Sequence, residues 1–306
     1  MILLTVLICL VCCFCAAVLI VHGAIFTNRA SPLFSYFAKR GRDPGFQAHR
    51  EEAERQMSRA ARTEMTAVSS RGERLLGYYY PCGETPSGRI ALMVHGLGSN
   101  HTQACGMHYE YYHRHGFDVF CCENQGMKRK RGRYVGYGVW EEGDCLDWIA
   151  HLTARFGENT VFVLHGFSMG ASSLLRICDR CPPQVRFLVS DSGFSNGDRL
   201  LASRLRGLYL PVRLWNRFRL GYDIRDTDTV GRVRESRVPI LFVHGLCDRV
   251  VPYAMGEELY AACGGEKELL TVAGAGHVES RHRDAAAYDA GLDAFMARYV
   301  AELPRD

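Results

Sequence analysis

Short apolar runs recur along most of this chain, and polar stretches of helical length separate them. Runs of this kind, bounded by turn residues, are typical of strands that are buried on both faces of a sheet. They occupy residues 90–94, 119–122, 161–164, 187–190, 240–243 and 269–272, with helical patterns near 102–115, 141–156, 169–180, 254–263 and 284–301. Strands that alternate with helices predict the α/β class, with a mostly parallel sheet and helices on both of its faces. A β-hairpin over 65–80 is expected to precede them.

The first 26 residues have a different pattern, because apolar residues follow one another almost without interruption and no Asp, Glu, Lys or Arg appears. About 20 such residues span the hydrocarbon core of a bilayer. A signal peptide is the alternative, but no Lys or Arg precedes Arg29 and no small-x-small cleavage sequence is clear. We therefore expect an uncleaved transmembrane anchor over 1–26. Basic residues occur only after this span, which places the following domain on the cytoplasmic side.

A polar connector over 27–64 is expected to link the anchor to one domain over 65–303. Within the connector, Glu51 and Arg55 stand four residues apart, which favours a solvated helix. The chain has 13 cysteines, and those beyond the anchor are odd in number and often fall in predicted strands or helices. This usage indicates a reduced compartment more than a disulfide scaffold, and a lone Cys-x-x-Cys pair gives no expectation of a metal site.

The charge balance gives no reason to expect a nucleic-acid partner, since the net charge is only +4. One short basic run, residues 128–133, is expected to be a solvated loop. An anionic membrane surface is its functional alternative, because clustered Lys and Arg residues bind such surfaces.

The most informative motif is Gly-Phe-Ser-Met-Gly at residues 166–170, between an apolar run and a helix-like run. Strand, G-x-S-x-G and helix in this order form the context of a nucleophile elbow, a tight turn that presents its serine. Glycines at both flanks avoid collisions in such a turn, and the serine stands at a helix N-terminus that favours negative charge. Ser168 is therefore the candidate nucleophile. A glycine-rich turn whose serine merely caps the helix is the alternative.

A serine hydroxyl needs a base to remove its proton, and the base needs a third group to orient it. Asp248 follows the apolar run 240–243, and His277 follows the run 269–272, so both fall just past predicted strand ends, as Ser168 does. In an open parallel sheet these ends share the edge where ligands bind. Serine, acid and histidine is also the chain order of enzymes built on this elbow. Asp248 is the candidate acid and His277 the candidate base.

Other polar residues end strands as well. Asp191 follows the run 187–190 and is the rival acid. His95, His165 and His244 precede glycines at strand ends, but none follows the acid in the chain, so we expect them to be structural.

A tetrahedral oxyanion needs hydrogen-bond donors. The first is expected to be the backbone N–H of Met169, directly after the nucleophile, and the second that of Leu97, in the Gly-rich loop after residues 90–94. An ordinary glycine turn is the alternative reading of that loop.

With these residues, the chain resembles the α/β-hydrolase superfamily. The resemblance covers residues 65–303 and rests on the His-Gly-Leu-Gly stretch at 95–98, the elbow at 166–170, Asp248 and His277. More narrowly, the chain is similar to membrane-anchored bacterial hydrolases related to the prolyl oligopeptidase and serine aminopeptidase groups. Many such proteins carry Asp-x-Arg-Gly-His-Gly after the fourth strand, where this chain has Glu-Asn-Gln-Gly-Met-Lys at 123–128.

Residues 194–236 are too long for a bare connection between two strands, and they combine leucines with regularly spaced arginines. We predict a small helical cap over the active-site edge. Its apolar face is expected to line an acyl pocket, and its arginines to face phospholipid headgroups. An amphipathic helix packed on the core is the alternative.

The resemblance implies a serine hydrolase that cleaves an ester, including lipid esters and thioesters, through an acyl-enzyme. It implies no metal or organic cofactor. A serine peptidase is the runner-up, and Glu141 and Glu142 are its candidates to hold a free substrate amine. Acyl transfer would use the same three side chains. From another class, the alternative is a non-catalytic hydrolase-fold protein that binds a ligand or partner at the membrane. The sequence leaves the oligomeric state open.

Overall fold

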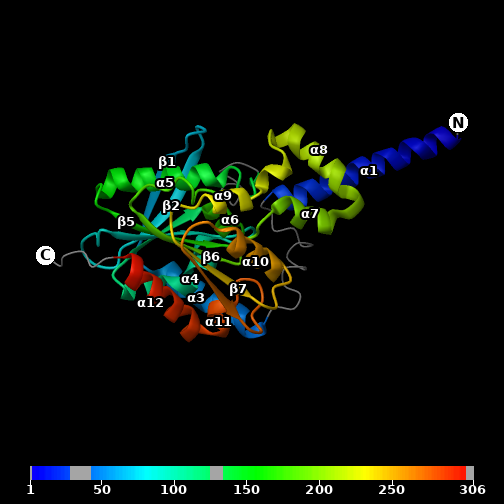
Figure 1. Cartoon of the computed structure of the whole chain (residues 1–306). Coiled ribbons are helices and arrows are strands. Elements are labelled where there is room, and N and C mark those ends of the chain that lie inside the picture. The colour runs from blue at the N-terminus through cyan, green and yellow to red at the C-terminus, as the bar shows by residue number, and fades with distance from the viewer. Residues whose placement is uncertain (1, 28–42, 125–133, 301–306) are drawn as a thin grey trace.

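The core of the molecule is one eight-stranded sheet, and the computed structural model describes residues 2–27, 43–124 and 134–300 (Figure 1). The strands are β1 (Thr63–Val68), β2 (Arg74–Tyr80), β3 (Arg89–Val94), β4 (Asp118–Glu123), β5 (Val161–Phe167), β6 (Val185–Asp191), β7 (Ile240–Gly245) and β8 (Lys267–Val272). Their order in the sheet is β1-β2-β4-β3-β5-β6-β7-β8. The pairs β1–β2 and β2–β4 are antiparallel, and all other neighbours are parallel.

The inner strands are apolar at successive positions because both faces of the sheet are covered there. In β3, Ile90, Leu92 and Val94 belong to one buried cluster. Ala91 and Met93 belong to the cluster on the other face. Side chains alternate between faces along a strand, so one unbroken apolar run feeds two cores.

Helices lie on both sides of the sheet (Figure 1). One core contains side chains of α5 (Glu141–Phe156), α6 (Met169–Leu175), α9 (Val230–Arg234) and α10 (Tyr253–Ala262). The other contains side chains of α3 (Pro44–Arg59), α4 (His101–Arg114) and α12 (Ala285–Tyr299), and the short α11 (Ser280–Arg283) directly precedes α12. The predicted α/β class, with a mostly parallel sheet between two helical layers, is confirmed.

The helix α3 belongs to the folded domain, so the expectation of a solvated helix inside the 27–64 connector is wrong. Phe46, Ala53 and Met57 are buried. A Cβ atom on Gly106 of α4 would lie 2.9 Å from the carbonyl oxygen of Ala53, so the two helix backbones are in close contact. The apolar face of α3 is narrow, and it is covered because α4 presents a glycine to it. Residues 28–42 of the connector lie outside the described residues.

The N-terminal helix α1 (Ile2–Phe26) is long and apolar enough to cross a membrane, and it is the one such helix among the described residues. Such a helix serves either as an anchor or as a signal sequence. Residues 2–16 are exposed, whereas Val18, His22 and Phe26 are buried against the rest of the molecule. The final third of this helix is therefore part of the folded structure, which its composition did not indicate.

Between β6 and β7 the chain forms the small helical insertion that we expected over 194–236. It consists of α7 (Gly197–Leu205), η1 (Arg206–Leu208), α8 (Tyr209–Leu220), η2 (Ile224–Thr227) and α9. Helix α1 packs directly on α8 (Figure 1). The imidazole of His22 and the side-chain oxygen of Asn216 lie 3.2 Å apart, and both residues are buried. We call residues 194–236 the cap.

Candidate active site

Ser168 lies at the tip of a sharp turn between β5 and α6, with φ of 53°. A Cβ atom on Gly166 would lie 2.5 Å from Cα of Ala171, and one on Gly170 would lie 2.1 Å from the carbonyl oxygen of Val94. No side chain fits at either position, so both glycines of the motif are required. The strained serine conformation is the one that a nucleophile elbow imposes.

The three residues singled out from the sequence meet at one edge of the sheet. Oγ of Ser168 lies 2.8 Å from Nε2 of His277, and Nδ1 of His277 lies 2.7 Å from Oδ2 of Asp248. They come from the segments that follow β5, β8 and β7. His277 thus bridges a hydroxyl and a carboxylate in the arrangement that activates a serine.

Asp248 is held as an ionised acceptor. Burial alone would raise the pKa of its carboxyl group, but His277 and His244 lower that pKa to well below its ordinary range. Its second oxygen, Oδ1, accepts hydrogen bonds of 2.8 Å from the backbone N–H groups of Val250 and Val251. Because an ionised carboxylate only accepts, Nδ1 of His277 carries the proton, and Nε2 is left to accept from Ser168.

The candidate oxyanion donors lie on the two segments that flank the nucleophile. Met169 is the first residue of α6, immediately after Ser168. Leu97 follows Gly96, on which a Cβ atom would lie 3.0 Å from Cβ of Ser168. The loop after β3 therefore runs against the nucleophile, with its Gly-rich backbone on the serine side. Leu97 and Met169 also belong to one apolar cluster that includes cap residues.

The rival acid Asp191 is turned toward other partners. Its carboxylate accepts hydrogen bonds from the hydroxyl of Ser192 (2.9 Å) and from that of Tyr288 (3.0 Å). The geometry therefore assigns the histidine's carboxylate partner to Asp248. Of the other strand-end histidines, His95 accepts from the backbone N–H of Asn124 at 3.1 Å. Nε2 of His244 lies 3.0 Å from the carbonyl oxygen of Val251, beside Asp248.

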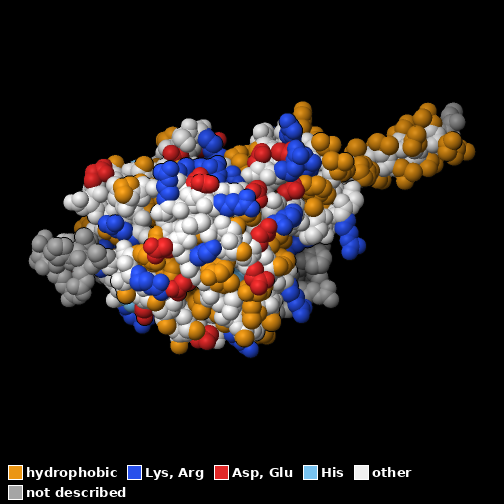
Figure 2. All heavy atoms as spheres, in the orientation of Figure 1, with side chains coloured by type: hydrophobic (Ala, Val, Ile, Leu, Met, Phe, Trp, Pro, Cys, Tyr) orange, Lys and Arg blue, Asp and Glu red, His pale blue; other side chains and the backbone are white. Residues whose placement is uncertain are grey.

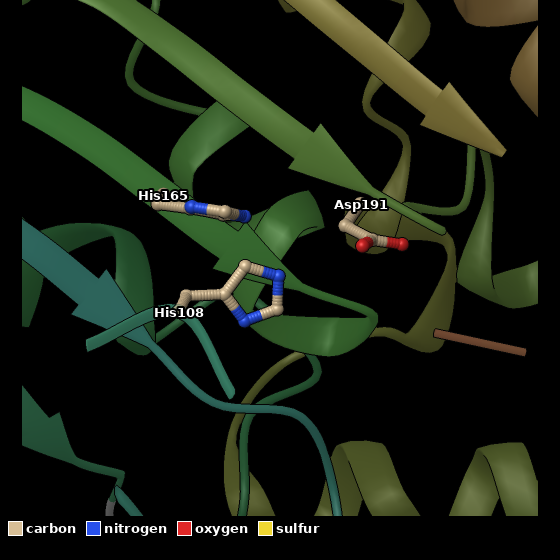
Figure 3. A group of neighbouring side chains, drawn as sticks. All are labelled: His108, His165 and Asp191. Carbon is tan, nitrogen blue, oxygen red and sulfur yellow. The ribbon is translucent and has the colours of Figure 1, made fainter. Parts of the chain in front are cut away.

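Behind the nucleophile, His108, His165 and Asp191 form a buried group whose possible ligand atoms lie within 4.8 Å of one another (Figure 3). The two ring nitrogens of His165 each lie 3.0 Å from a tyrosine hydroxyl, one of Tyr112 and one of Tyr288. Tyr288 also donates to Asp191, so Tyr112, His165, Tyr288 and Asp191 form a hydrogen-bonded relay. His108 only packs edge-on against the ring of His165.

The relay reaches the loop of His277. The hydroxyl of Ser192 donates to Asp191 and accepts from the backbone N–H of Val278 at 3.1 Å. Val278 directly follows His277, so this bond fixes the backbone that carries the base. The sequence did not lead us to Ser192 and Tyr288 as residues that help to position the His277 loop. Ser192 could have been selected from the sequence, because it directly follows a strand-end aspartate, whereas nothing local marks Tyr288.

The two acidic residues considered as holders of a substrate amine are engaged elsewhere. Glu141 is buried, and its carboxylate accepts from the backbone N–H groups of Gly136 and Gly138, both at 2.8 Å. Glu142 forms ion pairs with Arg176 at 3.0 Å and Arg180 at 3.2 Å. Both carboxylates therefore stabilise the fold around α5 and α6. The predicted basic run at 128–133 lies outside the described residues.

Comparisons with known proteins agree with this fold. The serine hydrolase (FSH1) family matches residues 141–285. The esterase Pf2001 of Pyrococcus furiosus has a similar structure, with a TM-score of 0.63 and 18% identity over 80% of this chain and 95% of the esterase. The matched segment and the shared fold support a serine hydrolase. A puromycin-hydrolyzing peptidase of Mycobacterium tuberculosis shares the fold of this chain, with a TM-score of 0.61 and 17% identity over 81% of this chain and 40% of the peptidase.

The chain also has similar sequences among curated proteins. The uncharacterized protein YqkD of Bacillus subtilis is 25% identical over 77% of this chain and 79% of its own length. A Saccharomyces cerevisiae protein described as an uncharacterized membrane protein is 25% identical over 50% of this chain and 51% of its own length.

Proposed function

We propose that Ser168, His277 and Asp248 form a catalytic triad that hydrolyses carboxylic esters through an acyl-enzyme. The observation that carries the proposal is the position of His277, with Nε2 at 2.8 Å from Oγ of Ser168 and Nδ1 at 2.7 Å from Asp248. Small molecules or peptides are the substrate classes of such hydrolases, and the relation to the Pyrococcus furiosus esterase supports the ester.

The reaction follows from the side chains in place. Oγ of Ser168 attacks the ester carbonyl carbon while Nε2 of His277 takes the hydroxyl proton. The N–H groups of Leu97 and Met169 donate to the oxyanion, and Asp248 stabilises the imidazolium. The C–O bond breaks as His277 returns the proton to the leaving alcohol. Water, deprotonated by His277, then attacks the acyl-enzyme, and the carboxylic acid leaves with Ser168 restored.

An ester is a better substrate candidate than a peptide with a free amino terminus, because the acidic residues Glu141 and Glu142 of α5 are already engaged. An enzyme that trims amino-terminal residues needs a carboxylate to hold the substrate ammonium group. Glu141 already accepts two backbone hydrogen bonds, and Glu142 already pairs with two arginines. Using either for substrate would break an interaction that the fold contains, and in the case of Glu141 that interaction is buried.

We further propose that α1 is a retained membrane anchor. Cleavage after it would remove Val18 and Phe26 from a buried cluster and would leave Asn216 without His22. The catalytic domain would then include α3 and the last turns of α1 in addition to residues 65–303. Its position on the cytoplasmic side is supported by the basic residues that follow α1, and by cysteines that are all free, including buried ones.

The test is the removal of the nucleophile. Ser168→Ala in the full chain should lower the turnover of a short p-nitrophenyl ester by about 10⁴-fold or more, because the remaining groups cannot form the acyl-enzyme. The same variant should lose labelling by a fluorophosphonate. Ser58→Ala, on the exposed side of α3, is the matched control and should keep both. Retained turnover in a folded Ser168→Ala protein would show that another group is the nucleophile.

A further inference from the structure

The cap presents an apolar stripe to solvent. Leu210, Leu214 and Phe218 of α8 are 54%, 58% and 79% exposed. They stand four residues apart and so share one face of the helix, while Val212 and Asn216 on the other side are fully buried. Outside α1, the large apolar side chains exposed in the described parts of the chain number five, and three of them form this stripe. A helix with one face in the core and an apolar face outside has a second surface to cover.

The stripe lies beside the anchor helix. Val18 and His22 of α1 are buried against the cap, but Leu19 and Ile20, at the same level of the helix, are 48% and 71% exposed. The outward surface of α1 thus remains apolar alongside the cap, with no polar spacer before the contact. Figure 2 shows the apolar side chains of α1 running up to those of the cap. If Ile20 lies in hydrocarbon, the neighbouring cap surface must lie at the bilayer boundary.

The charge of the cap fits a lipid surface. Residues 194–236 contain nine arginines and five acidic residues, an excess of +4 that equals the net charge of the whole chain. The side chain of Arg217, one residue before Phe218, is 67% exposed. Apolar residues on one face with flanking arginines are typical of helices that lie in the headgroup region of a membrane.

The same elements connect the membrane side to the nucleophile. One apolar cluster contains Val18 and Phe26 of α1, Val212 of α8 and Met169, and Leu97 packs against it. Met169 and Leu97 are the residues whose N–H groups are the proposed oxyanion donors. The wall of the active site is therefore continuous with the elements that face the bilayer.

We propose that α8 lies in the bilayer surface beside α1, with Leu210, Leu214 and Phe218 among the acyl chains, and that the site takes long-chain acyl esters from that surface. This inference rests on the proposed anchor and ester hydrolysis. It assigns the substrate class, a lipid acyl ester, and it makes the cap a membrane contact in its own right.

The position of α8 is tested with tryptophan. The full chain is reconstituted in vesicles of phosphatidylcholine and phosphatidylglycerol whose acyl chains are brominated near the glycerol end. Phe218→Trp should add fluorescence that the brominated lipid quenches, after subtraction of the parent signal. Val68→Trp is the control, because Val68 is 71% exposed but lies on β1, at the edge of the sheet away from the cap. Equal quenching at the two positions would overturn the proposal.

The link to substrate is tested with the double variant Leu214→Ser, Phe218→Ser. Hydrolysis of a long-chain ester embedded in the vesicles should fall at least tenfold, whereas that of a short soluble ester should stay within twofold. Val68→Ser should change neither. Equal loss on both esters, or no loss on the embedded one, would contradict the inference. A parent protein that hydrolyses neither ester would instead contradict the proposed hydrolysis, and the quenching experiment would still report where α8 lies.

Discussion

At the proposed active site, three residues without the freedom of glycine adopt positive φ angles. Ser168, Ser192 and Val278 have φ of 53°, 56° and 54°. Such conformations cost on the order of 1 kcal/mol or more each, so the surrounding contacts must hold them. The backbone N–H of Ser168 donates to the carbonyl oxygen of Asp191 at 2.8 Å, and that of Val278 donates to Ser192. The strained backbones of the proposed nucleophile and of the residue next to the proposed base are thus tied to one strand end.

Ser192 is therefore expected to be a positioning residue for the base. Ser192→Ala removes the acceptor of the Val278 N–H and frees the segment that carries His277. We expect kcat for a soluble ester to fall about tenfold with little change in KM, because an unsatisfied buried group costs about 1–3 kcal/mol and the loop can move to relieve it. Steady-state kinetics beside a thermal melt give the answer. An unchanged kcat, or a rise in KM alone, would contradict this role.

At this scale, a site residue can be predicted from the sequence only where a local pattern marks it. Ser168, Asp248 and His277 could be selected because each follows an apolar run, and the ends of parallel strands share an edge. Leu97 and Met169 follow from the same reasoning about strand ends. Tyr288 could not be selected, because it sits within a helix and meets Asp191 only through the packing of α12 on the sheet.

At the scale of whole elements, the N-terminal helix shows what hydrophobicity alone leaves undecided. An apolar helix surface fits lipid and protein equally well, so the composition of α1 predicted a span but not its contact with α8. The informative residue is His22, a polar group in an apolar run, which is buried with Asn216 and stacks on Phe26 at 4.8 Å. Helix α3 was misread for a related reason, because its few apolar residues are spread over a mostly charged helix.

The contact between α1 and the cap predicts a loss of stability on mutation. His22→Ala leaves the amide of Asn216 buried without this partner, and it should lower the free energy of unfolding by about 1–3 kcal/mol. Denaturant unfolding of the full chain in detergent micelles measures the change, with Leu7→Ala on the exposed part of α1 as the control. The double variant with Asn216→Ala should lose less than the sum of the two single changes. Additive losses would show that the two side chains do not interact.

For the molecule as a whole, the buried relay makes stability depend on pH. Burial raises the pKa of Asp191 to about 6, against the opposing effect of its bonds from Ser192 and Tyr288. In the unfolded chain an aspartate titrates near pH 4, so between about pH 4 and 6 the folded protein keeps a proton that the unfolded chain has lost. Stability contributed by this group is complete below that window and falls as the pH rises through it.

Replacing the carboxyl group of Asp191 should make the stability of the protein depend less on pH. A shift of about two pKa units corresponds to a loss of up to about 3 kcal/mol between pH 4 and 7, and Asp191→Asn removes it because an amide of the same shape does not titrate. Denaturant midpoints at several pH values compare the two proteins. Burial also raises the pKa of Asp144, to about 7, so both proteins retain the decline that this second group causes. The prediction concerns the difference between the two curves: the stability of the Asn variant minus that of the parent should rise by up to about 3 kcal/mol from pH 4 to pH 7. Parallel curves would show that Asp191 is ionised in the folded protein throughout this range.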